Sequence, residues 1–526
     1  MNSQHYLQRP NHFISRIACL LIASACYMVS ASVSADTVAN ASLKTPPGSA
    51  EEWAVAAKID LNAAYEETLN NHPGVYDPHN PDFINKLELA KKNGLAIASQ
   101  VHDAAGYAAA ISAFNTGLHD GHAGAFSTLD DKQMPVPRWP GFFSVWRGDG
   151  LYIYASEHAD LHVGAKIVSC DGVQIKDVIL NNVFAFEGRS DEVGHWWVRA
   201  GKVFVDRGNP FVTLPQQCQF SFDGQLFKRD IKWEATDSNF EQWRKRAYNG
   251  DELPVGLTEP RAKLFWVAMP TFDPNEAERI AYLKLSAEVL EKREHMLNAD
   301  AIVIDLRHNQ GGSSMWSKHF AEALWGEARV NRKMDAYSRD YQVWWRASQD
   351  NTDYMLGLVD QFKQQEILDS AAWASENGNA MKAALLRGDK YYIARDEAGK
   401  NIVTDPNVDL PTDPVPLSKP VYVIVPGQCA SACLDALDVF TRFAGTKLIG
   451  APSSADSTYM EVRVKTLPSG FADVLIPNKM YVNRPRVSGQ GYLPEITVDD
   501  LEWSTANLLK VVEKDLALKY RDSTGG

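Results

Sequence analysis

The sequence predicts an α/β fold with two further structural regions, and three observations lead to this prediction. From residue 260 onward, buried-strand patterns alternate with amphipathic helical patterns, as in a mostly parallel sheet with crossover helices. Residues 51–130 show only helical periodicity, and residues 135–235 show short strands separated by turns. We therefore expect an N-terminal helical region (51–130), a β-rich module (135–235) and an α/β core (260–520), with residues 326–415 as a mostly helical insertion in the core.

The N-terminus has the composition of an export signal. Basic residues precede an apolar block at 17–29, and small residues follow at 32–35. We expect residues 1–35 to be a cleaved signal peptide, residues 36–50 to be a disordered lead, and the mature protein to be periplasmic or secreted, without stable membrane insertion. The alternatives are an uncleaved anchor and a lipoprotein attached at Cys26.

The overall charge disfavours nucleic acid as a partner. The 526 residues include 66 acidic and 53 basic side chains, which gives a formal net charge of −13. Phosphate binding needs a basic face, which this balance does not favour. The composition is otherwise that of a globular protein of two or three domains.

Four cysteines lie outside the signal segment. An exported chain reaches an oxidising compartment, where these cysteines can form disulfides. We favour a Cys170–Cys218 bond, because both residues fall in the β-rich module. Cys429 and Cys433 are four residues apart, and a regular helical turn with this spacing is a poor disulfide geometry. A Cys429–Cys433 bond is therefore disfavoured, and the pairing of the four cysteines does not follow from the sequence.

The stretch 421–440 carries the strongest candidate nucleophile. A buried strand at 421–425 is broken by Pro-Gly, and a helix follows. Ser431 is the only Ser or Thr in this stretch, and it lies at the strand-to-helix junction. A hydroxyl there can attack a carbonyl while helix N-terminal N–H groups face the developing oxyanion. The alternatives are that Ser431 is a helix cap and that Cys429 is the nucleophile, which an oxidising compartment disfavours.

His122 is the candidate base. It lies in a glycine-rich loop that ends the helical region, and histidine exchanges protons near neutral pH. His119 and His122 form no convincing metal pair, because no third ligand with suitable spacing follows. We therefore expect neither a metal nor an organic cofactor. Gly311 and Gly312, after the predicted strand at 301–307, allow a backbone N–H to approach a ligand closely, although such glycines are also common in packing.

The run 160–175 resembles the carboxylate-binding-loop half of PDZ domains. Gly164 is followed after two residues by Ile167 and then by a short strand that ends in Asp171-Gly172. This resemblance implies that an extended peptide binds along a sheet edge. The alternative is a purely structural β-module.

Four elements in this order resemble the C-terminal-processing (tail-specific) and tricorn-like serine peptidase family. They are the motif at 118–122, the PDZ-like module, the strand and glycine loop at 303–312, and the turn at 427–433. The segment 491–496 also resembles that family's Gly-x-x-Pro-Asp-Val motif. The resemblance implies a β-α-β spiral, crotonase-like peptidase core with a helical N-terminal part and an inserted PDZ-like module.

The same resemblance assigns roles to individual residues. Ser431 takes the position of the nucleophile, and the backbone N–H groups of Ala432 and of the Gly311-Gly312 loop would form the oxyanion hole. Which of the two glycines contributes stays open. Peptidases of the Ser/Lys type carry a lysine on the strand after the nucleophile helix, but this chain has Asp456 there.

A Ser/His site, in which His122 accepts the proton of Ser431, is therefore favoured over a Ser/Lys site. Lys465 lies too far along to replace the missing lysine, and Ser488 stands where the tricorn branch has an acidic residue. Asp456 is our hypothesis for the third catalytic residue, and Asp120 is the second choice.

These observations predict an exported serine endopeptidase-like hydrolase that cleaves a peptide or protein substrate by acyl transfer. The alternative is a catalytically inactive relative that acts as a peptide-binding protein, because the lysine and the acidic partner are both displaced. The natural substrate and the oligomeric state do not follow from the sequence.

Overall fold

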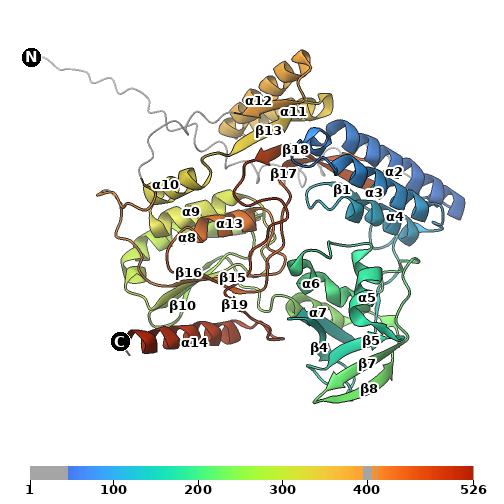
Figure 1. The fold of residues 1–526 in the computed structure, drawn as a ribbon, viewed down its shortest axis with the longest axis horizontal. Helices are drawn as coiled ribbons and strands as arrows, with labels where there is room; N and C mark the ends of the chain where they lie inside the picture. The colour runs from blue at the N-terminus through green and yellow to red at the C-terminus, as the bar shows by residue number, and fades with distance from the viewer. Residues whose placement is uncertain (1–45, 395–404, 412, 525–526) are drawn as a thin grey trace, which may run out of the picture.

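The structure is a computed structural model that describes residues 46–394, 405–411 and 413–524 (Figure 1). The predicted signal peptide, the lipoprotein cysteine Cys26 and most of the lead at 36–50 lie outside the described residues. None of the described helices combines the length and the apolar character that a bilayer crossing requires.

Three antiparallel-packed helices form the N-terminal region, as Figure 1 shows in blue. The first helix begins with a capping box in which Ser49 and Glu52 bond each other's backbone N–H groups. The helices share a core with strand β18 of the main body, where Val474 and Ile476 are fully buried. The elements are α2 (Ala50–Asn71), η1 (Pro73–Tyr76), α3 (Phe83–Ala98) and α4 (Ala104–Gly117).

A six-stranded sheet forms the centre of the α/β core, with the order β10-β11-β12-β15-β16-β19. Its strands are parallel from β11 onward, and only β10 is antiparallel to its neighbour. The alternate residues of β15 contact different cores, so this strand is buried on both faces, as a run of β-branched residues predicts. The strands are β10 (Gly256–Arg261), β11 (Leu264–Ala268), β12 (Ala301–Asp305), β15 (Val421–Val425), β16 (Thr446–Gly450) and β19 (Ile496–Thr497).

Helices cover both faces of this sheet. Figure 1 shows α8 (Glu276–Leu297), α9 (Ser314–Trp325) and α13 (Ala432–Phe440) on one face and α14 (Thr505–Thr524) on the other. The carboxyl ends of parallel neighbours meet at one edge, so the loops that follow β12 and β15 come together there. These are the loops that carry the predicted glycines and the predicted nucleophile.

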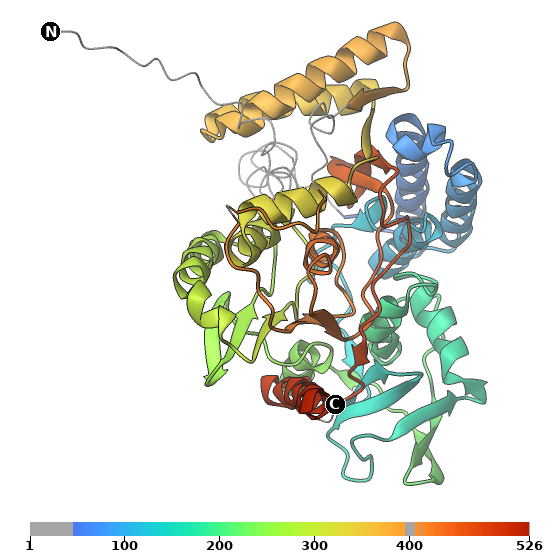
Figure 2. The same cartoon turned by 60° about the vertical axis from the view of Figure 1, so that its left-hand side comes forward.

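A second, antiparallel sheet joins segments that are far apart in the sequence, with the order β1-β18-β13-β14 and β17 beside β18. The insertion at 326–415, which we expected to be mostly helical, contains helices and also supplies two strands of this sheet. Its orange helix pair projects from one end of the molecule (Figure 2). The elements are β1 (Gly124–Ser127), α10 (Glu327–Tyr337), β13 (Gln342–Arg346), α11 (Gln349–Gln364), α12 (Leu368–Arg387), β14 (Tyr391–Ala394), β17 (Tyr459–Thr466) and β18 (Ala472–Val482).

A third sheet has the strand order β3-β4-β5-β7-β8, with β6 beside β5. Together with the helices and short strands between residues 138 and 247 it forms a separate lobe, which we call the third-sheet module. The predicted Cys170–Cys218 disulfide is confirmed and joins β5 to β7 at directly paired positions. The elements are β2 (Arg138–Trp139), β3 (Phe142–Arg147), β4 (Gly150–Ser156), β5 (Lys166–Cys170), β6 (Val173–Gln174), α5 (Ile175–Ile179), η2 (Leu180–Phe184), α6 (Val193–Arg199), η3 (Ala200–Phe204), β7 (Gln217–Phe222), β8 (Gln225–Asp230), β9 (Glu234–Ala235) and α7 (Ser238–Ala247).

The mixed α/β architecture predicted from the sequence is thus present, with helices and several sheets. The spiral, crotonase-like character of the core and the PDZ-like character of the third-sheet module stay predictions.

Candidate active site

Ser431 lies on a strained turn between β15 and α13. Its backbone has φ 55° and ψ −128°, a region that a non-glycine residue occupies at a cost of about 1–3 kcal/mol. Ser431 occupies the N-cap position of α13, but its side chain makes no cap hydrogen bond. The helix-cap alternative is therefore wrong, because the hydroxyl is not used for capping.

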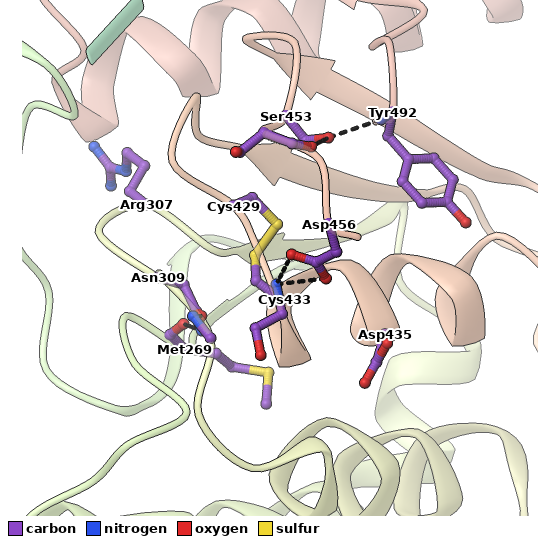
Figure 3. The surroundings of a disulfide bond; sticks show 12 residues. Met269, Arg307, Asn309, Cys429, Cys433, Asp435, Ser453, Asp456 and Tyr492 are labelled. Atoms are coloured by element: carbon purple, nitrogen blue, oxygen red, sulfur yellow. Dashed lines mark hydrogen bonds between the residues drawn. A yellow bond between two sulfur atoms is a disulfide. The ribbon is translucent and has the colours of Figure 1, made fainter. Parts of the chain in front are cut away.

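A disulfide between Cys429 and Cys433 spans this turn, and Figure 3 shows it beside Asp456. The sequence-based expectation that disfavoured this bond is wrong. It assumed a regular helical turn, whereas the positive φ of Ser431 leaves Cys429 outside the helix and brings the two Cα atoms to 5.2 Å. A bonded sulfur carries no thiolate, so the structure also contradicts the Cys429 nucleophile.

Asp456 holds the backbone of the nucleophile. Both of its carboxylate oxygens accept the backbone N–H of Ser431, at 3.0 and 2.9 Å. Its side chain is buried, and Arg486 Nη1 lies 3.4 Å from Oδ2. The structure thus places this carboxylate on the Ser431 backbone, a contact that the sequence did not predict.

Asp120 organises the loop that carries His122. Its Oδ1 accepts the backbone N–H of His122 and the hydroxyl of Ser457, each at 2.8 Å. Its Oδ2 lies 3.6 Å from His72 Nε2. Burial would raise the pKa of Asp120, but His72, followed by His122, lowers it below its ordinary value. Asp120 is therefore a turn residue that also ties this loop to the segment next to Asp456.

The imidazole of His122 has no acidic partner at Nδ1. This atom is buried, and it has no hydrogen-bond partner among the residues that the structure describes. Neither Asp456 nor Asp120 bonds it, so neither orients the ring through Nδ1.

Asp435 is an acidic residue near the site that the sequence prediction missed. It lies one helical turn after Ser431, and its Oδ2 accepts the hydroxyl of Ser314 at 2.7 Å. Burial would raise its pKa, but Arg484 and Arg486 lower it, and His122 contributes in the same direction. The signal for this residue was its place in the first turn of α13, four residues after Ser431.

Ser431 and His122 line one cavity of about 2000 Å³, together with Gly311, Gly312 and Asp435. Residues of the segments around His122, Gly311, Ser431 and Asp456 thus all line this cavity. Within the described parts of the chain, no group of three or more histidine, cysteine or acidic side chains is arranged to hold a metal ion.

The glycine loop approaches the nucleophile so closely that a side chain does not fit. A Cβ on Gly311, which has φ +112°, would lie 2.8 Å from Ser431 Cβ and 2.7 Å from the Ala430 carbonyl oxygen. The N–H of Gly311 donates to Asn309 Oδ1 at 2.9 Å. By contrast, the N–H groups of Gly312 and Ala432 have no acceptor among the described residues.

The lysines do not support a Ser/Lys site. Lys465 pairs with Glu67 at 2.6 Å, a hydrogen bond that raises its pKa, and it does not line the cavity. The lysines that line the cavity lie in ion pairs, namely Lys202 with Glu187, Lys318 with Glu322 at 3.4 Å and Lys479 with Glu461 at 3.2 Å.

No protein-family model and no curated protein sequence matches the chain. Among solved structures, mature CPAF complexed with lactacystin aligns over 88% of this chain and 98% of its own, with 13% sequence identity and a TM-score of 0.58. The structure of mature CPAF gives 12% identity, 88% and 97% coverage and the same TM-score of 0.58. Tricorn protease also matches, with 11% identity over 88% of this chain and 37% of its own, but its TM-score of 0.34 is too low to show a shared fold.

The resemblance to C-terminal-processing, S41-like peptidases that the order of the motifs indicates is thus supported at the level of the fold. Mature CPAF shares this fold with the present chain over nearly its whole length. At 12–13% identity the likeness establishes the fold, and activity must be argued from the site.

Proposed function

We propose that the protein is a serine peptidase that cleaves peptide bonds by acyl transfer with Ser431 as nucleophile and His122 as base. The observation that carries this proposal is the turn at Ser431. Its positive φ presents the residue at a strand-to-helix junction, its hydroxyl is not used as a cap, and it lines the same cavity as His122.

In the proposed reaction, neutral His122 takes the hydroxyl proton while Ser431 Oγ attacks the substrate carbonyl carbon. We assign Nε2 to this transfer, because Nδ1 is buried. The tetrahedral intermediate collapses, the C–N bond breaks, and the amine leaves with the proton from His122. Water then attacks the acyl carbon while His122 takes one of its protons. The ester C–O bond breaks and His122 returns the proton to Ser431 Oγ, which releases the carboxylic acid and restores free Ser431 and neutral His122.

The oxyanion hole consists of the N–H groups of Gly312 and Ala432 in this proposal. These two donors are unpaired among the described residues, whereas the Gly311 N–H is bonded to Asn309 and the Ser431 N–H to Asp456. Donors that are free and fixed before the reaction stabilise the developing charge most effectively.

The Asp456 carboxylate holds the backbone N–H of Ser431 and does not act on the His122 imidazole. Asp435 lines the same cavity and pairs with Arg484 and Arg486, so it holds the first turn of α13 in place. The site therefore functions as a Ser/His pair supported by carboxylates.

The substrate is a peptide or protein segment. The cavity of about 2000 Å³ exceeds the roughly 300–1,000 Å³ of ordinary small-molecule pockets. We also propose that the core is a β-α-β spiral, that the third-sheet module is PDZ-like and binds the extended substrate, and that the protein is exported. The two disulfides support export, since such bonds persist in oxidising compartments.

One observation favours the alternative, a catalytically inactive peptide-binding protein. His122 Nδ1 has no carboxylate partner among the described residues, so no group fixes the tautomer that a Ser/His site uses.

Labelling with a fluorophosphonate probe separates the two functions. The peptidase predicts stoichiometric labelling of the folded wild-type protein, no labelling of Ser431→Ala, and much slower labelling of His122→Ala. Lactacystin, which mature CPAF binds in its solved structure, serves as a second probe. If the folded wild-type protein is not labelled and cleaves no member of a peptide library, the peptidase proposal fails, and binding of peptides from that library would support the alternative.

A further inference from the structure

Helix α6 of the third-sheet module packs directly against the loops of the candidate site (Figure 1). A Cβ on Gly194, in the first turn of this helix, would lie 2.4 Å from the carbonyl oxygen of Gly427 and 2.5 Å from that of Ser453. The helix backbone therefore touches the loop before Ser431 and the loop before Asp456, with no side chain between them.

Arg189, just before this helix, bridges the two loops that hold the catalytic pair. Its Nη2 donates to the carbonyl oxygen of Ala455 at 2.9 Å, and its Nη1 donates to the carbonyl oxygen of His119 at 3.3 Å. Ala455 precedes the carboxylate that holds the Ser431 N–H, and His119 lies three residues before His122. One planar guanidinium thus spans the nucleophile side and the base side of the site.

Glu192 completes the bridge. It pairs with Arg189, and its Oε2 accepts the N–H of Ala455 at 3.0 Å and the hydroxyl of Ser454 at 2.7 Å. The Arg189–Glu192 pair therefore binds both the N–H and the C=O of Ala455. Because both backbone groups of Ala455 are bound, the position of the loop at this residue is fixed.

His195 supports this pair as a neutral group. Its Nδ1 accepts the backbone N–H of Arg189 at 2.9 Å, so the ring proton lies on Nε2, which is 3.1 Å from Ser454 Oγ. Although Ser454, His195 and Glu192 together have the composition of a hydrolase triad, Ser454 is buried and its hydroxyl donates to Glu192. The cluster is thus a support for the loop and not a second nucleophile.

We propose that Arg189 is a positioning residue for the Ser431/His122 reaction and acts through the carbonyl groups of Ala455 and His119. This inference rests on the proposed peptidase function and extends it. It makes the third-sheet module necessary for turnover, in addition to any role in binding substrate. A misplacement of reacting groups by about 1 Å can lower a rate about 100-fold, so the loss of such a bridge should affect turnover.

Kinetics of Arg189→Ala and Arg189→Lys test the inference. For Arg189→Ala we expect kcat on a peptide substrate to fall about 10- to 100-fold while KM changes less than about threefold. Added guanidinium ion should restore part of kcat, because it can refill the space between the two carbonyl groups. Arg189→Lys should retain intermediate activity, since one ammonium cannot span both loops. Thermal unfolding of each variant is measured alongside.

The matched control is Arg229→Ala. Arg229 lies in β8 of the same module and pairs with Asp160, and it neither lines the cavity nor contacts either loop among the described residues. We expect its kcat to stay within about twofold of wild type. An equal loss of kcat in both variants, an unchanged kcat in Arg189→Ala, or a failure of guanidinium to restore any activity would overturn the inference.

Amide hydrogen exchange gives a readout that does not depend on activity. In Arg189→Ala, exchange should become faster in residues 453–457 and 119–122, and in Arg229→Ala it should not. If wild-type protein shows no turnover but exchange changes in this way, the proposed function fails while the bridge between the loops stands. If exchange in these two segments does not change, the inference fails whether or not the wild type is active.

Discussion

The backbone N–H of Ser431 donates to both carboxylate oxygens of Asp456, which lie 3.0 and 2.9 Å away. This contact explains how a serine is kept at φ 55°, because it fixes the peptide plane before the strained residue. It also removes the Ser431 N–H from the set of possible oxyanion donors, which leaves the neighbouring N–H of Ala432.

Replacing Asp456 by asparagine should lower kcat with little change in KM. The amide keeps the size of the side chain but loses the charge, and a hydrogen bond to a charged group is worth roughly 1.5–3 kcal/mol, which corresponds to a loss of about 10- to 100-fold. Steady-state kinetics and the rate of fluorophosphonate labelling measure this effect. Equal rates for the variant and the wild type would show that Asp456 does not hold the nucleophile in its reactive position.

His122→Ala should reduce the labelling rate of Ser431 by about 100-fold or more, the usual contribution of a general base. The matched control is His102→Ala, because His102 is an exposed histidine of the same helical region and does not line the cavity. If the two variants label at the wild-type rate, a different residue accepts the proton. His308, which lines the cavity and has an unpaired buried Nε2 among the described residues, would then be tested next.

The two disulfides should differ in what they contribute. Cys429 and Cys433 are 4 residues apart and Cys170 and Cys218 are 48 apart, so loop-entropy estimates give roughly 2 and 4 kcal/mol of stability. Replacing the short-range pair by serines should impair activity more than stability, because that bond spans the turn at Ser431. Replacing the other pair should lower the unfolding temperature while the labelling rate of the folded protein is retained. The opposite pattern would contradict a functional role for the Cys429–Cys433 bond.

Much of the site was predictable because its residues have recognisable local chemistry. Ser431 follows a strand break, and Gly311 stands where the backbone comes so close to Ser431 that a Cβ does not fit. The Cys170–Cys218 bond could be inferred from a shared module. The Cys429–Cys433 bond could not, because serine has no intrinsic preference for positive φ, and helical spacing suggested the wrong distance.

The supporting contacts were not predictable for a different reason. Arg486 reaches Asp438 and Asp456, 48 and 30 residues away, and Arg189 reaches Ala455, 266 residues away. Such pairs are created by tertiary packing and leave no periodic pattern in the sequence. The same holds for β13, a short strand of the insertion that pairs with β18 outside the insertion and with β14 inside it.

Gly311→Ala should abolish activity in a protein that still folds. Its Cβ would meet Ser431 Cβ at 2.8 Å and the Ala430 carbonyl oxygen at 2.7 Å, and its backbone lies at a positive φ. Gly256→Ala is the control, because Gly256 has open space around it and no positive φ. Circular dichroism checks folding, and probe labelling measures the site. Normal labelling of Gly311→Ala would show that the glycine loop lies farther from the nucleophile in solution.

The protein should become less stable as the pH falls, and His195 should account for part of this loss. Burial, followed by the charges of Arg199 and Arg189, lowers the pKa of His195 to about 3, whereas the unfolded chain has the ordinary value near 6.5. Between these two pH values only the unfolded state binds the proton, so the free energy of unfolding decreases as pH falls from about 6.5 to about 3. At 1.36 kcal/mol per pH unit the full loss is roughly 4–5 kcal/mol. Urea unfolding of His195→Gln across this range should show a correspondingly weaker pH dependence than wild type, and equal pH profiles would show that His195 is not held neutral.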